Sequence, residues 1–113
     1  MKNIVILISG GGSNMAAIVR ASRQQNWAAQ VPARVVAVIS NKASAGGLAW
    51  ARGEGIATQA LDHKAFASRE AFDAELARTI DTYQPSLVVL AGFMRILTPG
   101  FVAHYQGRLV NIH

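Results

Sequence analysis

Short apolar runs alternate along the chain with longer segments whose apolar positions recur at helical spacing. The continuous runs at Asn3–Ile8, Arg34–Ser40 and Leu87–Ala91 are typical of strands buried on both faces of a sheet. Weaker strands are expected at Thr58–Leu61 and Leu109–Ile112. Because a helical pattern separates each strand from the next, the sequence predicts a regular β-α alternation.

Four helices are expected between these strands. Two are predicted at Met15–Gln25 and Ala45–Gly53. Ser68 can cap a third helix with its hydroxyl, and the apolar stripe of that helix continues as far as Tyr83. Thr98, followed by a proline, is a typical start for the fourth helix.

This order predicts an α/β fold, with a doubly wound and mostly parallel sheet covered by helices on both faces. We expect the chain to wind outward from the first strand to the third and then return, so that the fourth strand lies beside the first. The chain has neither internal repeats nor a linker. It stops at the fifth strand without a following helix, and we therefore expect a truncated domain.

The composition narrows the possible functions. The chain has 113 residues, of which 51% are hydrophobic and 15% charged, as in a single globular domain. It has no cysteine and no apolar stretch approaching the roughly 20 residues of a membrane span, so we expect a cytoplasmic protein with no membrane partner. The net charge of +5 is spread along the chain without basic runs, which favours a solvated basic surface over a nucleic-acid site and is also compatible with small anionic ligands.

Polar or flexible segments occur at the carboxyl ends of the predicted strands. In open α/β sheets, ligands bind outside these ends, near the point where the strand order reverses. The segments are Gly10–Asn14 after the first strand, Ser40–Lys42 after the second, Phe93–Leu97 after the fourth, and Asn111–His113 at the fifth. The sequence therefore predicts an active site along this edge of the sheet.

The Gly10–Asn14 segment is suited to binding a phosphate. Glycines let the backbone approach a ligand closely, and the start of the following helix offers free N–H groups with a favourable dipole. A plain tight turn capped by Ser13 or Asn14 is the structural alternative. Met15 stands where a dinucleotide fingerprint needs a small residue, and no Gly-Lys-Ser/Thr sequence closes the loop, so a monophosphate fits best.

The two later segments have chemistry suited to a second substrate. An apolar turn with one guanidinium, at Phe93–Leu97, suits a heteroaromatic ring that bears carboxylates, although taken alone it favours a turn that completes the core. Asn111 and His113 lie two apart on a strand and therefore face the same side. An amide can donate a hydrogen bond to an oxyanion, and an imidazole can move a proton. The structural alternative is that both side chains only form hydrogen bonds that stabilise the strand end.

The segments ISGGGSN, SNK, SREAFD, VVLAGFMRIL and LVNIH, in this order, resemble the phosphoribosylglycinamide formyltransferase family over essentially the whole chain. The resemblance implies a Rossmann-like, three-layer formyltransferase fold, with residues 1–113 as the N-terminal part of a single domain. It implies transfer of a formyl group from 10-formyltetrahydrofolate to the amine of 5'-phosphoribosylglycinamide in purine biosynthesis, without a metal. Because the family continues for nearly as much chain again, we expect residues 1–113 alone to be inactive.

The resemblance also implies roles for individual residues. The residues implied to bind the ribonucleotide are Gly12, Ser13 and Asn14, those implied to bind the folate are Arg69, Met94, Arg95, Ile96, Leu97 and Asn111, and the catalytic pair is Asn111 and His113. Two alternatives stay open, namely another folate-dependent formyltransferase or deformylase of the same fold and a non-catalytic phosphate-binding module. The Gly10–Asn14 segment, called the glycine loop below, favours the enzyme that binds the ribonucleotide over these two alternatives. The sequence does not predict the oligomeric state.

Overall fold

A computed structural model describes residues 1–112 as an α/β fold built on one sheet. All strand pairs are parallel, and the five strands lie in the order β3-β2-β1-β4-β5. The strands are β1 (Lys2–Ile8), β2 (Ala33–Ser40), β3 (Ala57–Ala60), β4 (Leu87–Ala91) and β5 (Leu109–Ile112). This order confirms the predicted winding, because β4 lies beside β1 at the centre of the sheet.

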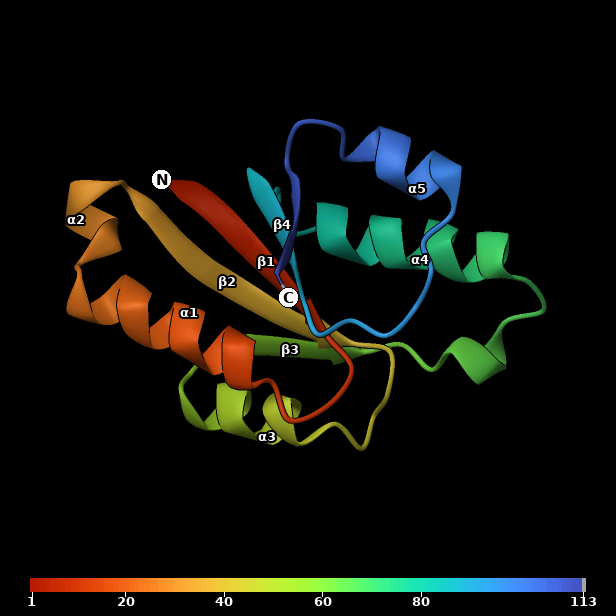
Figure 1. Ribbon diagram of the computed structural model, residues 1–113, viewed down its shortest axis with the longest axis horizontal. Coiled ribbons are helices and arrows are strands. Elements are labelled where there is room, and N and C mark those ends of the chain that lie inside the picture. Colours follow the sequence, from red (N-terminus) through yellow and green to blue (C-terminus); the bar gives the residue numbers. More distant parts are fainter. Residues whose placement is uncertain (113) are drawn as a thin grey trace.

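Helices cover both faces of the sheet, as expected for a three-layer fold (Figure 1). The helices are α1 (Ser13–Gln24), α2 (Trp27–Gln30), α3 (Gly46–Gly53), α4 (Arg69–Asp81) and α5 (Pro99–His104), with a short 3-10 helix η1 (His63–Ala65). The first three pack on one face, and α4 and α5 pack on the other. Within residues 1–112, no helix has the length and apolar character needed to cross a membrane.

The central strand β1 divides the core into two halves. Ile4, Ile6 and Ile8 pack toward α1 and α3, whereas Val5 and Leu7 pack toward α4 and α5. Because successive side chains of a strand point to opposite faces, a strand covered on both faces must be apolar at every position. The unbroken apolar run in the sequence has this physical cause.

The helix boundaries confirm two predicted caps and correct one prediction. The Ser68 hydroxyl accepts a hydrogen bond from the N–H of Ala71, and α4 starts there as expected. The Thr98 hydroxyl likewise caps α5. The expectation that the helix itself continues to Tyr83 is wrong, because α4 ends at Asp81, but Tyr83 packs against the same core cluster as the rest of the predicted stripe. Pro85 disfavours helical backbone at the residue before it. The short helices α2 and η1 were not predicted.

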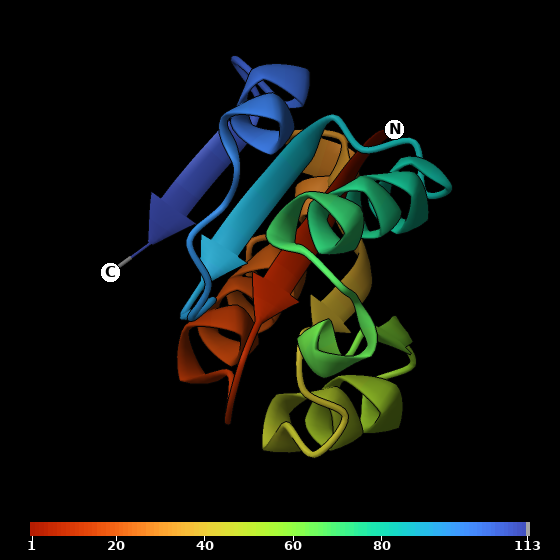
Figure 2. The same cartoon turned by 90° about the vertical axis from the view of Figure 1, so that its right-hand side faces the viewer.

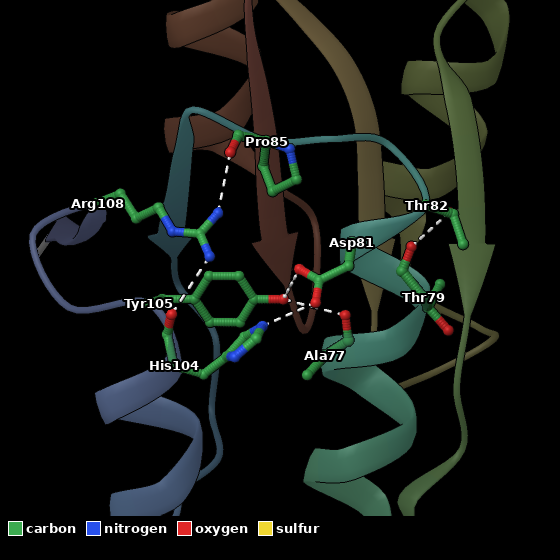
Figure 3. A network of polar contacts seen from close by, with 8 residues as sticks. All are labelled: Ala77, Thr79, Asp81, Thr82, Pro85, His104, Tyr105 and Arg108. Carbon is green, nitrogen blue, oxygen red and sulfur yellow. Dashed lines mark hydrogen bonds and ion pairs between the residues drawn. The ribbon is translucent and has the colours of Figure 1, made fainter.

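A buried tyrosine anchors α5 against α4 (Figure 3). The Tyr105 hydroxyl donates to the Asp81 carboxylate at 2.7 Å and contacts the Ala77 carbonyl at 3.0 Å. Burial and the bond to Asp81 raise the pKa of Tyr105 well above its ordinary value. Arg108 packs on the Tyr105 ring and donates to the Pro85 carbonyl, so this network ties the segment entering β5 to the segment entering β4.

Candidate functional site

The carboxyl ends of β1 and β4 lie side by side at the point where the order of the strands in the sheet reverses. After β1 the chain leads to α1 on one face, and after β4 it leads to α5 on the other. The arrows of β1 and β4 in Figure 2 end at the same edge of the sheet. Loops that leave a sheet in opposite directions open the crevice in which doubly wound proteins bind ligands.

The glycine loop leads into α1 without a side-chain cap. Gly12 is the N-cap residue, with a φ of 72° in the left-handed region that favours glycine. Ser13 and Asn14 are exposed, and within residues 1–112 no side chain caps the helix, so the structural alternative that either residue caps it is wrong. The first N–H groups of an uncapped helix are suited to an anion.

The loop rests on the start of α3 through a close backbone contact. The N–H of Gly47 donates to the carbonyl oxygen of Gly10 at 3.1 Å. A Cβ atom on Gly47 would lie 2.5 Å from Ile8 Cδ1 and 3.1 Å from Gly10 O. Gly47 is therefore a supporting residue of the loop. Sequence reasoning missed it, although the Gly46-Gly47 pair in a helix was a usable signal.

Ser9, the residue between β1 and the glycines, links three strand ends. Its hydroxyl donates to Asn41 Oδ1 at 2.6 Å, at the end of β2. The same oxygen accepts a hydrogen bond of 2.7 Å from the N–H of Met94, in the turn after β4. Ser9 and Asn41 are 5% and 2% exposed, so the bond between them is shielded from water, whereas the bond from Met94 is only partly buried. The sequence analysis assigned no role to Ser9.

The turn after β4 alternates between half-buried and exposed side chains. Phe93 and Leu97 pack against the core on the α4 side, as the structural interpretation of this segment expected. The guanidinium of Arg95 lies 4.6 Å from the centre of the Phe72 ring on α4. Met94 and Ile96 are 77% and 75% exposed, so the turn also presents an apolar surface to solvent.

The start of α4 lies against the far end of this turn. Asp73 is buried, and its Oδ2 accepts a hydrogen bond of 2.7 Å from the N–H of Thr98. Arg69 is exposed at the first residue of α4, one helical turn before Phe72. Arg69 is thus in the first turn of α4, and Arg95 packs on Phe72 near the same end of the helix. Sequence reasoning also missed Asp73, a lone carboxylate within an apolar helical pattern.

Asn111 lies near the end of β5, where it is paired in register with Leu90 of β4 and is exposed. His113, the other member of the predicted catalytic pair, lies outside the described residues. The structure thus joins the glycine loop and the Met94–Leu97 turn directly, through Ser9. It positions Asn111 on the strand next to β4 and Arg69 on a separate helix. Within residues 1–112, no group of three or more histidines and carboxylates could hold a metal ion.

The sheet order defines an open, doubly wound α/β protein, and proteins of this class bind ligands at the carboxyl edge of the sheet, where the strand-end segments lie. A family model described as "Formyl transferase" matches residues 2–113. The chain therefore belongs to the formyl transferase family.

Individual relatives agree with this assignment. The phosphoribosylglycinamide formyltransferase of Escherichia coli (strain K12) is 58% identical over 111 residues, which are 98% of this chain and 50% of the relative. The trifunctional purine biosynthetic protein adenosine-3 of Homo sapiens is 40% identical over 110 residues, which are 97% of this chain and 10% of that protein. The chain thus spans about half the length of the bacterial relative.

Solved structures show the same fold. The phosphoribosylglycinamide formyltransferase of Coxiella burnetii superposes with a TM-score of 0.91 at 48% identity, covering 99% of this chain and 51% of that one. The enzyme of the same name from Brucella melitensis also gives a TM-score of 0.91, at 49% identity, covering 99% of this chain and 56% of that one. These likenesses confirm the fold expected from the sequence.

Proposed function

We propose that this chain carries part of the site for formyl transfer from 10-formyltetrahydrofolate to the amine of 5'-phosphoribosylglycinamide, a step of purine biosynthesis. The observation that carries the proposal is the 58% identity to the Escherichia coli phosphoribosylglycinamide formyltransferase, which extends over 98% of the chain. The arrangement of the glycine loop and the turn after β4, on adjacent strands, supports it.

The ribonucleotide phosphate would bind at the start of α1. Gly12, Ser13 and Asn14 would offer backbone N–H groups, because no side chain of residues 1–112 caps this helix. The exposed positions of Ser13 and Asn14 leave room for a ligand at the loop. The basic charge of the chain favours an anionic substrate.

The folate would bind across the turn after β4. The exposed Met94 and Ile96 offer an apolar surface for the pterin ring, with Leu97 beneath them. Arg95 and Arg69 would face the carrier's carboxylates from the same end of α4. The planar guanidinium group of each arginine can form two parallel hydrogen bonds to a carboxylate.

The reaction would proceed through a tetrahedral intermediate. The substrate amine attacks the formyl carbon, so that a new C–N bond forms and the formyl oxygen gains negative charge. The Asn111 amide would donate to this oxygen, and His113 would move the proton from the attacking amine to the departing nitrogen of the carrier. Collapse of the intermediate breaks the carbon–nitrogen bond to the carrier and releases tetrahydrofolate. The residues need no metal for any of these steps.

The test is a formyl-transfer assay on residues 1–113 joined to the second half of the Escherichia coli enzyme. We expect turnover with both substrates, and a loss of about 10²–10³-fold on Asn111→Ala or His113→Ala. His104→Ala is the matched control, since His104 is an exposed histidine on α5 that pairs with Asp81 rather than with a residue of the strand ends. Undiminished turnover by both variants would contradict the catalytic assignment. We expect residues 1–113 alone to give no transfer.

The partners that we infer are therefore two small molecules, with neither nucleic acid nor a membrane involved. The cytoplasm stays the expected compartment, on the sequence grounds given above. Isothermal titration separates this proposal from a non-catalytic phosphate module, because such a module would bind the ribonucleotide and ignore a folate analogue.

A further inference from the structure

We propose that Ser9 is a positioning residue that holds the glycine loop and the turn after β4 at a defined separation and transmits ligand binding from one to the other. The proposal rests on the function proposed above, in which the loop binds the ribonucleotide and the turn binds the folate. Ser9 immediately precedes the loop and contacts the turn directly.

The Ser9 hydroxyl is held from both sides. It donates one hydrogen bond, to Asn41 Oδ1, and it accepts one, from the N–H of Met94. A hydroxyl can donate only once, so the bond to Asn41 orients the oxygen's lone pairs toward the Met94 amide. Because Asn41 is itself buried at the end of β2, this orientation is braced by a third strand. The bond to Asn41 is buried, where hydrogen bonds are stronger than in water, and the bond from Met94 is partly buried.

This arrangement lies between the two segments that are proposed to bind ligands. On one side, the Ser9 backbone continues directly into Gly10, so a shift of the loop moves the Ser9 oxygen. On the other side, Met94 begins the turn whose far end is held independently, by Asp73 at Thr98. With that far end held, a movement of Ser9 changes the position of the turn at Met94 rather than displacing the whole segment. The Ser9 oxygen is therefore a direct polar link between loop and turn.

The separation of the two segments matters for the chemistry. The amine of one substrate must come within about 3–3.5 Å of the formyl carbon of the other, and a misplacement of about 1 Å can lower the rate about 10²-fold. A single buried hydroxyl between the two segments sets this separation without contacting either substrate. Ser9 would therefore affect turnover more strongly than the binding of either substrate.

The first measurement is nuclear magnetic resonance of the isotope-labelled joined chain described above, titrated with 5'-phosphoribosylglycinamide. We expect the amide signals of Gly11 and Gly12 to shift as the ligand binds, and the Met94 amide signal to shift with them. In Ser9→Ala the loop signals should still respond, whereas the Met94 response should be lost. Ser9→Thr keeps the hydroxyl and should keep the response. Ser22→Ala is the matched control. The Ser22 hydroxyl also donates a hydrogen bond of 2.6 Å, but to the Val19 carbonyl within α1 rather than between strand ends.

The second measurement is turnover of the joined chain described above. Ser9→Ala should lower turnover by about 10²-fold, with a smaller change in either Michaelis constant, and Ser22→Ala should not. A Met94 signal that still responds in Ser9→Ala, or that is silent in the unmodified chain while the loop responds, would overturn the inference and leave the proposed function intact. Loop signals that do not respond at all in the unmodified chain would overturn the phosphate assignment, and this inference with it.

Discussion

The backbone N–H of Gly47, at the start of α3, donates to the carbonyl oxygen of Gly10 across 3.1 Å. This contact brings a helix that follows β2 against the loop that follows β1, so the shape of the loop depends on a residue far from it in sequence. The space between them is small enough that a methyl group at Gly47 would meet both Ile8 and the loop carbonyls.

Replacing Gly47 by alanine should therefore disturb the glycine loop. The added Cβ would lie 3.1 Å from Gly10 O and 3.2 Å from Gly11 O, and overpacking of this kind destabilises a protein by about 1–3 kcal/mol. Gly46→Ala is the control, because a Cβ there meets nothing within 4 Å. We expect urea denaturation and calorimetry with the ribonucleotide to show lower stability and weaker binding for Gly47→Ala only. Equal behaviour of the two variants would contradict the contact.

A second glycine should be sensitive for a conformational reason. Gly12 has a φ of 72°, and a Cβ there would lie 2.8 Å from Met15 Cε. The left-handed region costs an alanine about 1–2 kcal/mol, so Gly12→Ala should lower both the unfolding free energy and the affinity for the ribonucleotide. Gly11→Ala introduces neither strain nor a contact and should retain stability. The phosphate assignment would fail if Gly12→Ala bound the ribonucleotide with unchanged affinity.

Arg69 provides a test of the folate assignment. Charge-assisted hydrogen bonds contribute about 1.5–3 kcal/mol, so Arg69→Ala should weaken binding of a folate analogue by roughly 10-fold or more. Binding of the ribonucleotide should change little. Arg78→Ala is the control on the same helix, because Arg78 is exposed and pairs with Glu75. Calorimetric titration with each ligand measures both effects, and the reverse ranking of the two ligands would count against the assignment.

Tyr105 should make stability depend on pH in alkaline solution. Burial and the bond to Asp81 raise the pKa of Tyr105, so the folded chain retains its phenolic proton at a pH where the unfolded chain has lost it. The contribution of Tyr105 is therefore complete below its unfolded pKa of about 10 and decreases above it, by about 1.4 kcal/mol per pH unit. Tyr105→Phe lacks this titration, whereas both proteins share every other ionisable group.

Denaturant unfolding at several pH values from about 9 to about 11 measures the contribution of Tyr105 to the unfolding free energy. The lysines titrate in the same range, but their effect cancels when the free energies of the two proteins are subtracted. We expect the unfolding free energy of the unmodified chain to fall more steeply than that of Tyr105→Phe. Parallel curves would mean that the phenol ionises equally in both states.

Much of the fold could be predicted because its signals are local. The unbroken apolar run of β1 follows from burial on both faces, and Ser68 and Thr98 cap helices through residues three positions later. The end of α4 was predicted too late, because the apolar spacing continues through Tyr83 while Pro85 opposes helical backbone at the residue before it. The strand-end segments lie along one edge of the sheet, as parallel strands require, and the site at that edge stays a prediction.

The site could be predicted only in part. The roles of Gly12, Asn14, Arg69 and Asn111 stay predictions, and His113 lies outside the described residues. The links among the segments were not predictable, because Ser9 meets Asn41 and Met94 across 32 and 85 positions of sequence. Such pairs depend on strand order and on the register of β1 with its two neighbours, and no local pattern encodes them.

The sequence by itself thus determined the type and order of the elements, since burial and capping act on neighbouring residues. It also determined the chemistry available at the strand ends. Only the tertiary structure decided that Ser9 joins the loop to the turn and that Gly47 supports the loop. The reason is that hydrogen bonds need atoms within about 3 Å of each other. Only the assembled sheet brings these distant residues that close.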